Sequence, residues 1–525
     1  MRQSLILIAL FAASANAAKV NFHVIAPGAT MVEVSVNNHK TTLTAPDPSV
    51  PHFTGAAEAD NGATYKYVVE GVAEPFERRL KAGVTKTHND FVNRPITYAD
   101  IPDLPIVEPL WTRSGPRQAL FDSRYIPTIW VTADSAAVNS LVEKPHKKWI
   151  NGASLTFILA DQIKTFPGAR VGIHGAGKKH NNAKQSWRFQ LSEGHSFANR
   201  DYFKLRHMEE DPTQLREKLY ADAARALGTY VNEANMVRLF INGEGFGTFN
   251  LLDDITQYSF PKAMFYAGNP PEPMGALFDG RSGASFVYST KGDYSAWAKN
   301  PKSPEEVAAI GPLCKKWSEV VKTDDAQIAG FSKDFEVDHF LRFMVMEYLT
   351  GHWDGYWMAQ TNDGVYRDPT QGKKWFYIGQ DFDATFGVNI PEEYEHLVGW
   401  SYKDYTREKF PNAVMINGLL ENPTQRNTFE KYLKNTVKVL FNKATLTEHI
   451  LRYHDFYLPD LMWDRSIKQR SPGINFGWTM QEVKDNLWKG VEAPNQNGGG
   501  AEFGLIEWIV QKSEAVAVDF KIKRR

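Results

Sequence analysis

The sequence predicts an α+β protein in which a small all-β module precedes a larger domain of mixed helices and strands. Apolar and polar residues alternate in short segments such as 20–25, 32–36 and 65–69, as they do in strands with one buried face. Beyond residue 118, strand-like segments are interspersed with stretches of helical spacing such as 337–348. This order of segments is typical of an α+β fold.

The overall composition narrows the classes of partner. The 525 residues include 60 basic and 61 acidic side chains, for a formal net charge of −1. This balance gives no electrostatic reason to expect nucleic acid or an anionic membrane as a partner. Aromatic residues make up 13% of the chain, enough for a large core, and the single cysteine, Cys314, cannot form an internal disulfide.

Residues 1–17 read as a secretory signal peptide. Arg2 supplies the positive end, a short apolar run follows, and Ala15-Asn16-Ala17 fits the small-residue cleavage rule. The alternative is a buried first strand. No later run approaches the roughly 18 apolar residues of a membrane span, and the charged C-terminal residues 521–525 carry no lipid-anchor signal. We therefore expect a secreted protein, with the cell wall or spore surface as candidate locations.

The chain divides into several predicted parts. Residues 18–100 form a β-sandwich-like module, for which carbohydrate binding and a spacer role both stay open. Residues 101–118, with three prolines, read as a linker. The main domain spans 119–525, with an irregular insertion at about 262–330 and a helical region at about 425–525.

The main domain begins with strands around a glycine- and lysine-rich loop. Strands are expected at 169–173 and 186–191, and a helix is expected to begin near Asp211, which can cap it. A hairpin then runs through 236–252, with Asn242-Gly243 as its turn.

The loop between those first strands is a candidate phosphate site. Gly175 and Gly177 precede a group of lysines that ends at Lys184. Backbone N–H groups and ammonium charges in such a loop suit phosphates. The alternative is a polar hairpin tip, since the pattern matches no standard nucleotide motif.

Asp253 and Asp254 close the later hairpin. One of these acids is a candidate partner that holds Lys184 in place, as a kinase glutamate holds its phosphate-binding lysine. The alternative is a turn or helix cap, because Thr256 and Ser259 follow.

A second group of polar residues follows the apolar helix at 337–348. His352, Asp354 and Asn362 come in order, with a glycine directly after Asp354. Asp354 is a candidate base that orients a hydroxyl, and Asn362 a candidate metal ligand; the alternative is that Asp354 only caps a turn. His352 is expected to be a structural hydrogen-bonding residue, since no second histidine stands at metal-ligand spacing.

The clearest candidate site lies at the end of the strand-like run 375–378. Asp381 and Asp383 flank Phe382, and in a strand both carboxylates would share one face. Such a pair repels unless a cation or proton lies between the two acids. An acid, an amide and another acid in this order also occur in kinase phosphoryl-transfer sites. We therefore expect a divalent cation, Mg²⁺ or Mn²⁺, bound with a phosphate.

At these residues the chain resembles the CotH family, named for spore coat protein H. The resemblance is densest through residues 175–191, 203–228, 236–255 and 352–387. It implies a divergent protein-kinase-like domain that uses ATP and a divalent metal to phosphorylate serine or threonine in secreted or coat proteins.

The resemblance also implies roles for individual residues. Lys184 resembles the nucleotide-binding lysine and Asp253 its acidic partner, Asp354 the catalytic acid or base, and Asn362, Asp381 and Asp383 the metal ligands. The chain departs from ordinary kinases in the eight positions between Asp354 and Asn362, in the aspartate that ends the final motif, and in its glycine loop.

The resemblance is especially close to the secreted CotH-like proteins of mucoralean fungi, which act as invasins. This implies a second role, in adhesion and virulence, through a host-cell surface receptor. The segment 358–370 reads as an exposed receptor-binding loop. Its candidate contact residues are Met358, Thr361, Asn362, Asp363, Tyr366 and Arg367.

Overall fold

The computed structural model describes residues 18–175, 183–495 and 500–522, so the predicted signal peptide lies outside the described residues. The chain forms two compact units, one of residues 1–99 with 156–164 and one of 100–155 with 165–525. In the described part of the chain, no helix combines the length and apolar character needed to cross a membrane.

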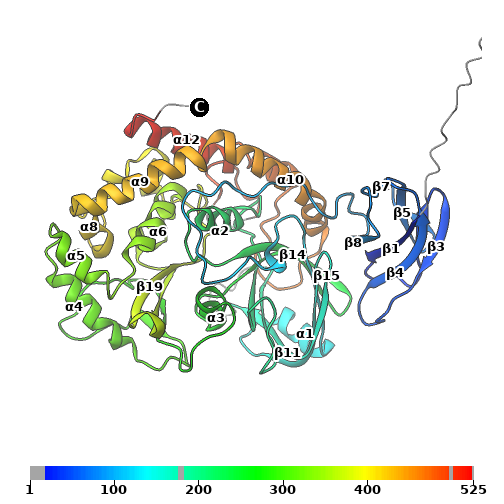
Figure 1. Cartoon of the computed structure of the whole chain (residues 1–525), viewed down its shortest axis with the longest axis horizontal. Coiled ribbons are helices and arrows are strands. Elements are labelled where there is room, and N and C mark those ends of the chain that lie inside the picture. Colours follow the sequence, from blue (N-terminus) through cyan, green and yellow to red (C-terminus); the bar gives the residue numbers. More distant parts are fainter. Residues whose placement is uncertain (1–17, 176–182, 496–499, 523–525) are drawn as a thin grey trace, which may run out of the picture. The chain divides into compact units, whose positions relative to one another are not determined.

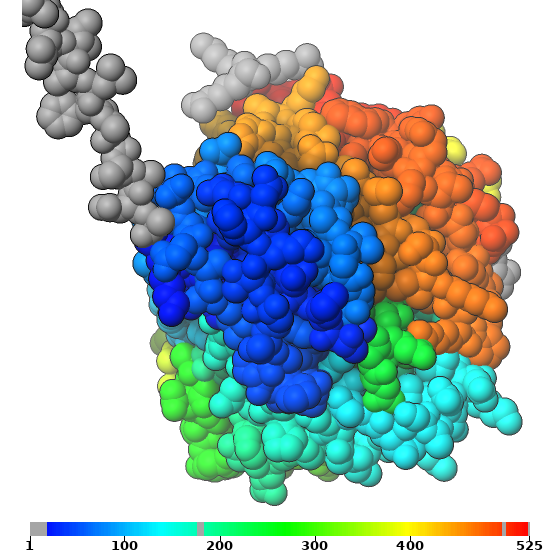
Figure 2. Space-filling view, turned by 90° about the vertical axis from the view of Figure 1, so that its right-hand side faces the viewer, coloured from blue at the N-terminus to red at the C-terminus, as the bar shows by residue number. Residues whose placement is uncertain are grey.

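The N-terminal unit consists of two sheets with a common hydrophobic core (blue in Figure 2). One sheet has the order β4-β1-β8 and the other β3-β2-β5-β6, with β7 paired to β5. Alternate residues of β1 and β2 fill the core, as the sequence pattern predicts. The strands are β1 (Ala18–Ile25), β2 (Val32–Val36), β3 (His39–Leu43), β4 (His52–Ala59), β5 (Thr64–Val69), β6 (Val72–Ala73), β7 (Arg78–Arg79) and β8 (Lys86–Phe91).

A closed seven-stranded barrel forms the first half of the main domain, in the order β10-β11-β12-β13-β15-β14-β9. The hairpin predicted around Asn242-Gly243 is its β14–β15 pair, and Asn242 and Gly243 both have the positive φ that the turn requires. The strands are β9 (Thr128–Thr132), β10 (Ile150–Ile158), β11 (Ile163–His174), β12 (Ser186–Gln190), β13 (Tyr202–Arg206), β14 (Ala234–Ile241) and β15 (Glu244–Leu252).

Helix α2 (Arg216–Ala226) begins five residues later than the sequence suggests. The Asp211 carboxylate accepts hydrogen bonds from the backbone N–H groups of Thr213 and Arg216, so Asp211 caps a tight loop that leads into the helix. A short-range capping signal identified the right residue but did not show how far away the helix starts.

The main domain also contains a second sheet, which is antiparallel and has the order β17-β16-β18-β19. Its strands are β16 (Leu277–Gly280), β17 (Trp297–Lys299), β18 (Asp363–Asp368) and β19 (Lys374–Gly379). The segment 262–330, expected to be irregular, therefore supplies two strands of this sheet.

Helices surround the two sheets of the domain (Figure 1). The long helix α6 packs against β19, α2, α9 and α12, and its buried apolar residues keep the predicted spacing. The remaining helices are α1 (Ser135–Glu143), α3 (Ser259–Tyr266), α4 (Gly311–Glu319), α5 (Asp325–Phe331), α6 (Val337–Thr350), α7 (Tyr356–Ala359), α8 (Val414–Glu421), α9 (Pro423–Val439), α10 (Lys443–Ser466), α11 (Met480–Asp485) and α12 (Leu505–Asp519).

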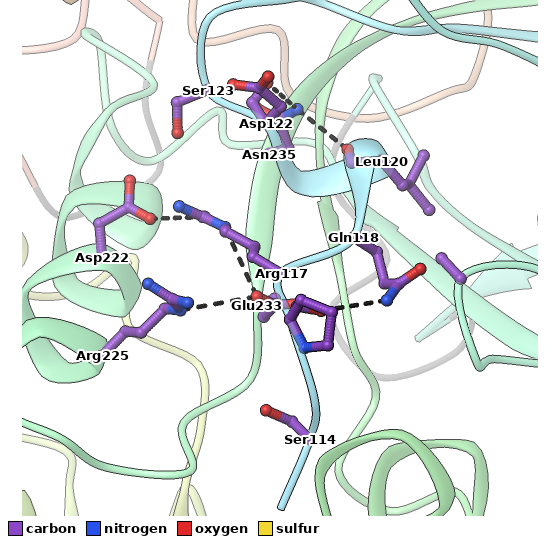
Figure 3. Close-up of polar contacts among 12 residues, drawn as sticks. Ser114, Arg117, Gln118, Leu120, Asp122, Ser123, Asp222, Arg225, Glu233 and Asn235 are labelled. Carbon is purple, nitrogen blue, oxygen red and sulfur yellow. Dashed lines mark hydrogen bonds and ion pairs between the residues drawn. The ribbon is translucent and has the colours of Figure 1, made fainter. Parts of the chain in front are cut away.

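The segment expected to be a linker, residues 101–118, belongs to the larger unit. Arg117 donates to Asp222 of α2 at 2.8 Å and lies 3.5 Å from Glu233, which also faces Arg225 (Figure 3). Upstream, the Trp111 indole donates to the backbone oxygen of Met264 at 2.6 Å. These contacts fix the segment against α2 and its neighbours.

Candidate active site

A cavity of about 1820 Å³ lies within the larger unit, between the barrel, the second sheet and the C-terminal region. Its lining includes Asp354, Asn362, Asp381 and Asp383, the acid, amide and two acids that the sequence singled out. One wall is contributed by Ile474, Phe476, residues 490–492 and residues 500–502. The sequence motifs of the C-terminal half therefore do meet at one place.

Asp354 is held by its two neighbours in the motif. The Nδ2 group of Asn362 donates to Asp354 Oδ2 at 2.8 Å and to the Asp354 backbone oxygen at 3.0 Å. The Nε2 atom of buried His352 lies 3.2 Å from Asp354 Oδ1. Burial lowers the pKa of His352, but Asp354 and Glu347 raise it, and the net shift is upward. These contacts hold the Asp354 carboxylate in one orientation at the cavity wall.

Asp381 and Asp383 face cations from β13. Arg206 donates through Nε and one terminal nitrogen to Asp383 Oδ2, at 2.9 and 2.7 Å, and its other terminal nitrogen lies 3.3 Å from Asp381 Oδ1. Lys204 Nζ lies 3.9 Å from the same Asp381 oxygen. Burial raises the pKa of Asp381, but Arg206 and Lys204 more than offset this and hold it low. For Asp383, burial and the Asp381 charge prevail over Arg206 and raise its pKa.

Glu217 of α2 completes an acidic cluster with these two residues. One carboxylate oxygen from each of Glu217, Asp381 and Asp383 lies within 4.8 Å of the others. Glu217 is fully buried, and neither of its carboxylate oxygens receives a hydrogen bond from any residue the structure describes. Burial and the two neighbouring acids raise the pKa of Glu217 to about 8.

The sequence did not identify Lys204, Arg206 or Glu217 as site residues. A signal was present, since Lys204 and Arg206 are two apart in a strand and so share a face, and Glu217 lies in the first turn of the helix that follows. The sequence gives no measure of their distance in space, because Arg206 and Asp383 are 177 positions apart.

The prediction that Asp253 pairs with Lys184 is wrong. Lys184 Nζ donates to Asp464 of α10 at 2.6 Å and lies 3.6 Å from Glu209. Asp253 instead accepts two hydrogen bonds from Arg200, at 2.6 and 2.9 Å. Both ion pairs are buried. A buried charge needs a partner within contact distance, and the fold places Asp464 beside Lys184 and Arg200 beside Asp253.

Of the loop residues assigned to phosphate binding, Gly175 and Lys184 line the cavity, and Gly177 lies outside the described residues. Lys184 is 2% exposed, and its ammonium group is already engaged by Asp464. The ion pairs that Asp381 and Asp383 make with lysine or arginine in the described residues come instead from Lys204 and Arg206 of β13.

The Lys184→Met variant is expected to lose about 3–5 kcal/mol of unfolding free energy. Asp464 is then left buried without its 2.6 Å partner, and the nearest remaining cation is Arg465 at 3.6 Å. Urea unfolding followed by tryptophan fluorescence measures this loss. The double variant Lys184→Met, Asp464→Asn should recover part of it, and an equal or larger loss in the double variant would contradict the ion pair's role.

The prediction that segment 358–370 is an exposed loop is also wrong. Its residues form α7 and the inner strand β18, and Met358, Asp363 and Tyr366 are buried. Strand β18 lies between β16 and β19, so the segment is polar in sequence but central in the sheet. Thr361, Asn362 and Arg367 are half-buried, and exposure is confined to the turn at residues 370–373.

Fold and cavity together define a protein with a mixed α and β domain whose cavity brings buried acids against basic side chains. A family model described as CotH kinase protein matches residues 171–484, more than half of the chain. The chain belongs to the CotH family.

Several curated proteins are similar to this chain. Invasin CotH3 of Rhizopus delemar is 54% identical over 99% of this chain and 88% of its own length. Spore coat protein homolog 1 of the same organism is 51% identical over 98% of this chain and 84% of its length. Inner spore coat protein H of Bacillus subtilis is 23% identical over 54% of this chain and 74% of its length.

Proposed function

We propose that the protein is a kinase that transfers the γ-phosphoryl group of ATP to serine or threonine hydroxyls of secreted or coat proteins. The carrying observation is that Asp354, Asn362, Asp381 and Asp383 line one cavity, with Arg206 against its acids. Protein kinases use this same set of groups: a catalytic-loop aspartate and asparagine, a metal-binding aspartate and a strand cation.

The order of elements in the barrel half supports the proposal. A glycine turn after β11 leads to β12, then to β13 with Lys204 and Arg206, then to α2 with Glu217, and finally to β14 and β15. In protein kinases a glycine-rich loop, a strand with the phosphate-binding lysine and a helix with a glutamate follow one another in this way. We therefore assign phosphate binding to Lys204 and Arg206 in place of Lys184.

The residues at the acidic side of the cavity fit a divalent cation. Their donors are carboxylate and amide oxygens, the ligands that Mg²⁺ and Mn²⁺ prefer. The buried Asp381 Oδ1 accepts no hydrogen bond from the described residues. Asp381, Asp383 and the amide oxygen of Asn362 would hold the cation, which when bound neutralises and orients the phosphates.

The proposed roles of the protein's own groups follow from their contacts. Asp354, fixed by Asn362 and His352, would accept a hydrogen bond from the acceptor hydroxyl and take its proton. Lys204 and Arg206 would bind the phosphate oxygens and compensate their charge.

The proposal is tested by ligand stabilisation and by transfer. ATP with Mg²⁺ or Mn²⁺ should raise the melting temperature, by mass action equivalent to about 2.7 kcal/mol at a hundredfold excess over Kd. The wild-type protein should transfer labelled phosphate to a casein-type acceptor, and the Asp383→Ala variant should not. The melting temperature of the variant without ligand should equal that of wild type, which shows that the variant is folded. Equal transfer by both proteins would refute the assignment.

We further propose adhesion as a second function, because relatives 54% and 52% identical are named invasins. The protein would be secreted, at the cell wall or spore surface, and would bind a host-cell surface receptor. The burial of β18 limits any contact by segment 358–370 to its half-buried residues and to the turn at 370–373.

Adhesion through that turn predicts a specific loss. A triple alanine variant at Thr370, Gln371 and Lys373 should bind host cells at least several-fold more weakly, because these residues are exposed. The matched control is alanine at Lys315 and Glu319 on α4, also exposed, which should bind normally. Flow cytometry with labelled protein measures binding, and normal binding by the turn variant would exclude this surface.

A further inference from the structure

Glu217 is a buried carboxylate for which the described residues supply no partner. It is the second residue of α2, it is 0% exposed, and neither oxygen receives a hydrogen bond from the described residues. A buried, unpaired carboxylate is strongly unfavourable. Either a proton or a bound cation must therefore compensate it.

The neighbouring cations are directed elsewhere. In protein kinases the helix glutamate pairs with the strand lysine. Here Arg206 makes its ion pairs with Asp381 and Asp383, and Lys204 lies nearest to Asp381. Glu217 instead approaches those two acids, with ligand oxygens within 4.8 Å. The carboxylates of Glu217, Asp381 and Asp383 therefore form one cluster.

Two contacts fix Glu217 in this position. Its neighbour Arg216 is clamped by Asp211 at 2.5 Å and by Asn486 at 2.8 Å, which fixes the start of α2. One turn along the same helix face, Tyr220 stacks on Phe382, with ring centroids 3.7 Å apart and an interplanar angle of 9°. Because Phe382 lies between Asp381 and Asp383, the helix and the acidic segment form one rigid arrangement.

We propose that Glu217 is the third carboxylate ligand of a divalent cation bound with Asp381 and Asp383. Carboxylate oxygens at this spacing suit hard cations such as Mg²⁺ and Mn²⁺. A ligand from the helix would place the cation against α2 rather than only against the Asn362 side of the cavity. A cation that is bound together with a nucleotide rests on the proposed kinase function. Binding of the metal ion alone can be measured whether or not the protein transfers phosphate.

Metal binding by the full-length protein tests the assignment without an activity assay. Wild-type, Glu217→Gln and Glu492→Gln proteins are each titrated with Mn²⁺. The concentration of free Mn²⁺ is measured by electron paramagnetic resonance. Glu492→Gln is the matched control, because Glu492 lines the same cavity, is exposed and lies outside the cluster. Glu217→Gln should bind Mn²⁺ at least about tenfold more weakly than wild type, and the control should match wild type.

Further measurements separate the possible results. Asp383→Asn should also lose Mn²⁺ binding, and circular dichroism should show that all variants are folded. Mn²⁺ affinity within twofold of wild type for Glu217→Gln would overturn the proposal, as would a wild-type protein that binds no Mn²⁺ at millimolar concentration. A wild-type protein that binds Mn²⁺ through Glu217 but transfers no phosphate would refute the kinase function and leave the metal ligand established. Phosphate transfer by wild type together with normal Mn²⁺ binding by Glu217→Gln would support the kinase function and exclude Glu217 as a metal ligand.

Discussion

Replacement of Asp354 with asparagine is expected to lower the rate of phosphoryl transfer by about 10²- to 10⁴-fold, the range typical for loss of a positioned acid–base group. The substitution keeps the size of the side chain and one oxygen. It removes the negative charge that faces His352. It also replaces one of the two carboxylate oxygens, which hydrogen-bond or face Asn362 and His352, with an amide NH2 group. Binding of ATP should change little, since Asp354 would contact the acceptor hydroxyl and not the nucleotide.

Initial rates with labelled ATP at several acceptor concentrations measure this effect, and melting curves with nucleotide verify that ATP still binds. Glu492→Gln is again a suitable control, because it alters an exposed acid of the same cavity and should retain the wild-type rate. A kcat for Asp354→Asn close to that of wild type would exclude Asp354 as the base.

Replacement of Arg216 with leucine is expected to destabilise the larger unit by about 3–5 kcal/mol, the usual effect of removing one partner of a buried ion pair. Arg216 is 0% exposed and donates to Asp211, to Asn486 and to the backbone oxygen of Phe503. Its loss leaves Asp211 buried and charged, and it also removes contacts between α2 and the C-terminal region.

Denaturant unfolding followed by tryptophan fluorescence reports on this unit alone, because all 14 tryptophans lie in it. Arg452→Leu is the matched control: Arg452 forms an exposed ion pair with Glu448, and such pairs contribute about 0–1 kcal/mol. A loss for Arg216→Leu as small as that of the control would contradict the role given to the buried network.

Features set by local sequence were predictable. The hairpin around Asn242-Gly243 and the helix at 337–350 follow from turn chemistry and from apolar periodicity, and both are present. Asp381 and Asp383 were recognised because two acids beside a strand require compensation, and the structure supplies Arg206 for that purpose.

Features set by long-range packing were not predictable. Lys184 finds Asp464, 280 positions away, and no local pattern marks that residue as its partner. The polar and charged residues of segment 358–370 favour an exposed loop. Its side chains instead form a protein-facing network, in which Asp368 accepts hydrogen bonds from Tyr266 and Arg113. Polarity in sequence cannot distinguish side chains that face water from side chains that face one another.

The cavity wall formed by Ile474, Phe476, residues 490–492 and residues 500–502 has a consequence for biosynthesis. The backbone N–H of Ala183, at the end of the glycine loop, donates to the oxygen of Ile474, and Ala501 bridges to Val388. A nascent polypeptide that ends at residue 450 would contain Asp354, Asn362, Asp381 and Asp383 but would lack this wall of the cavity. We therefore expect the protein to acquire ligand affinity only after translation has almost finished, so that nucleotide cannot be captured before the full chain has emerged.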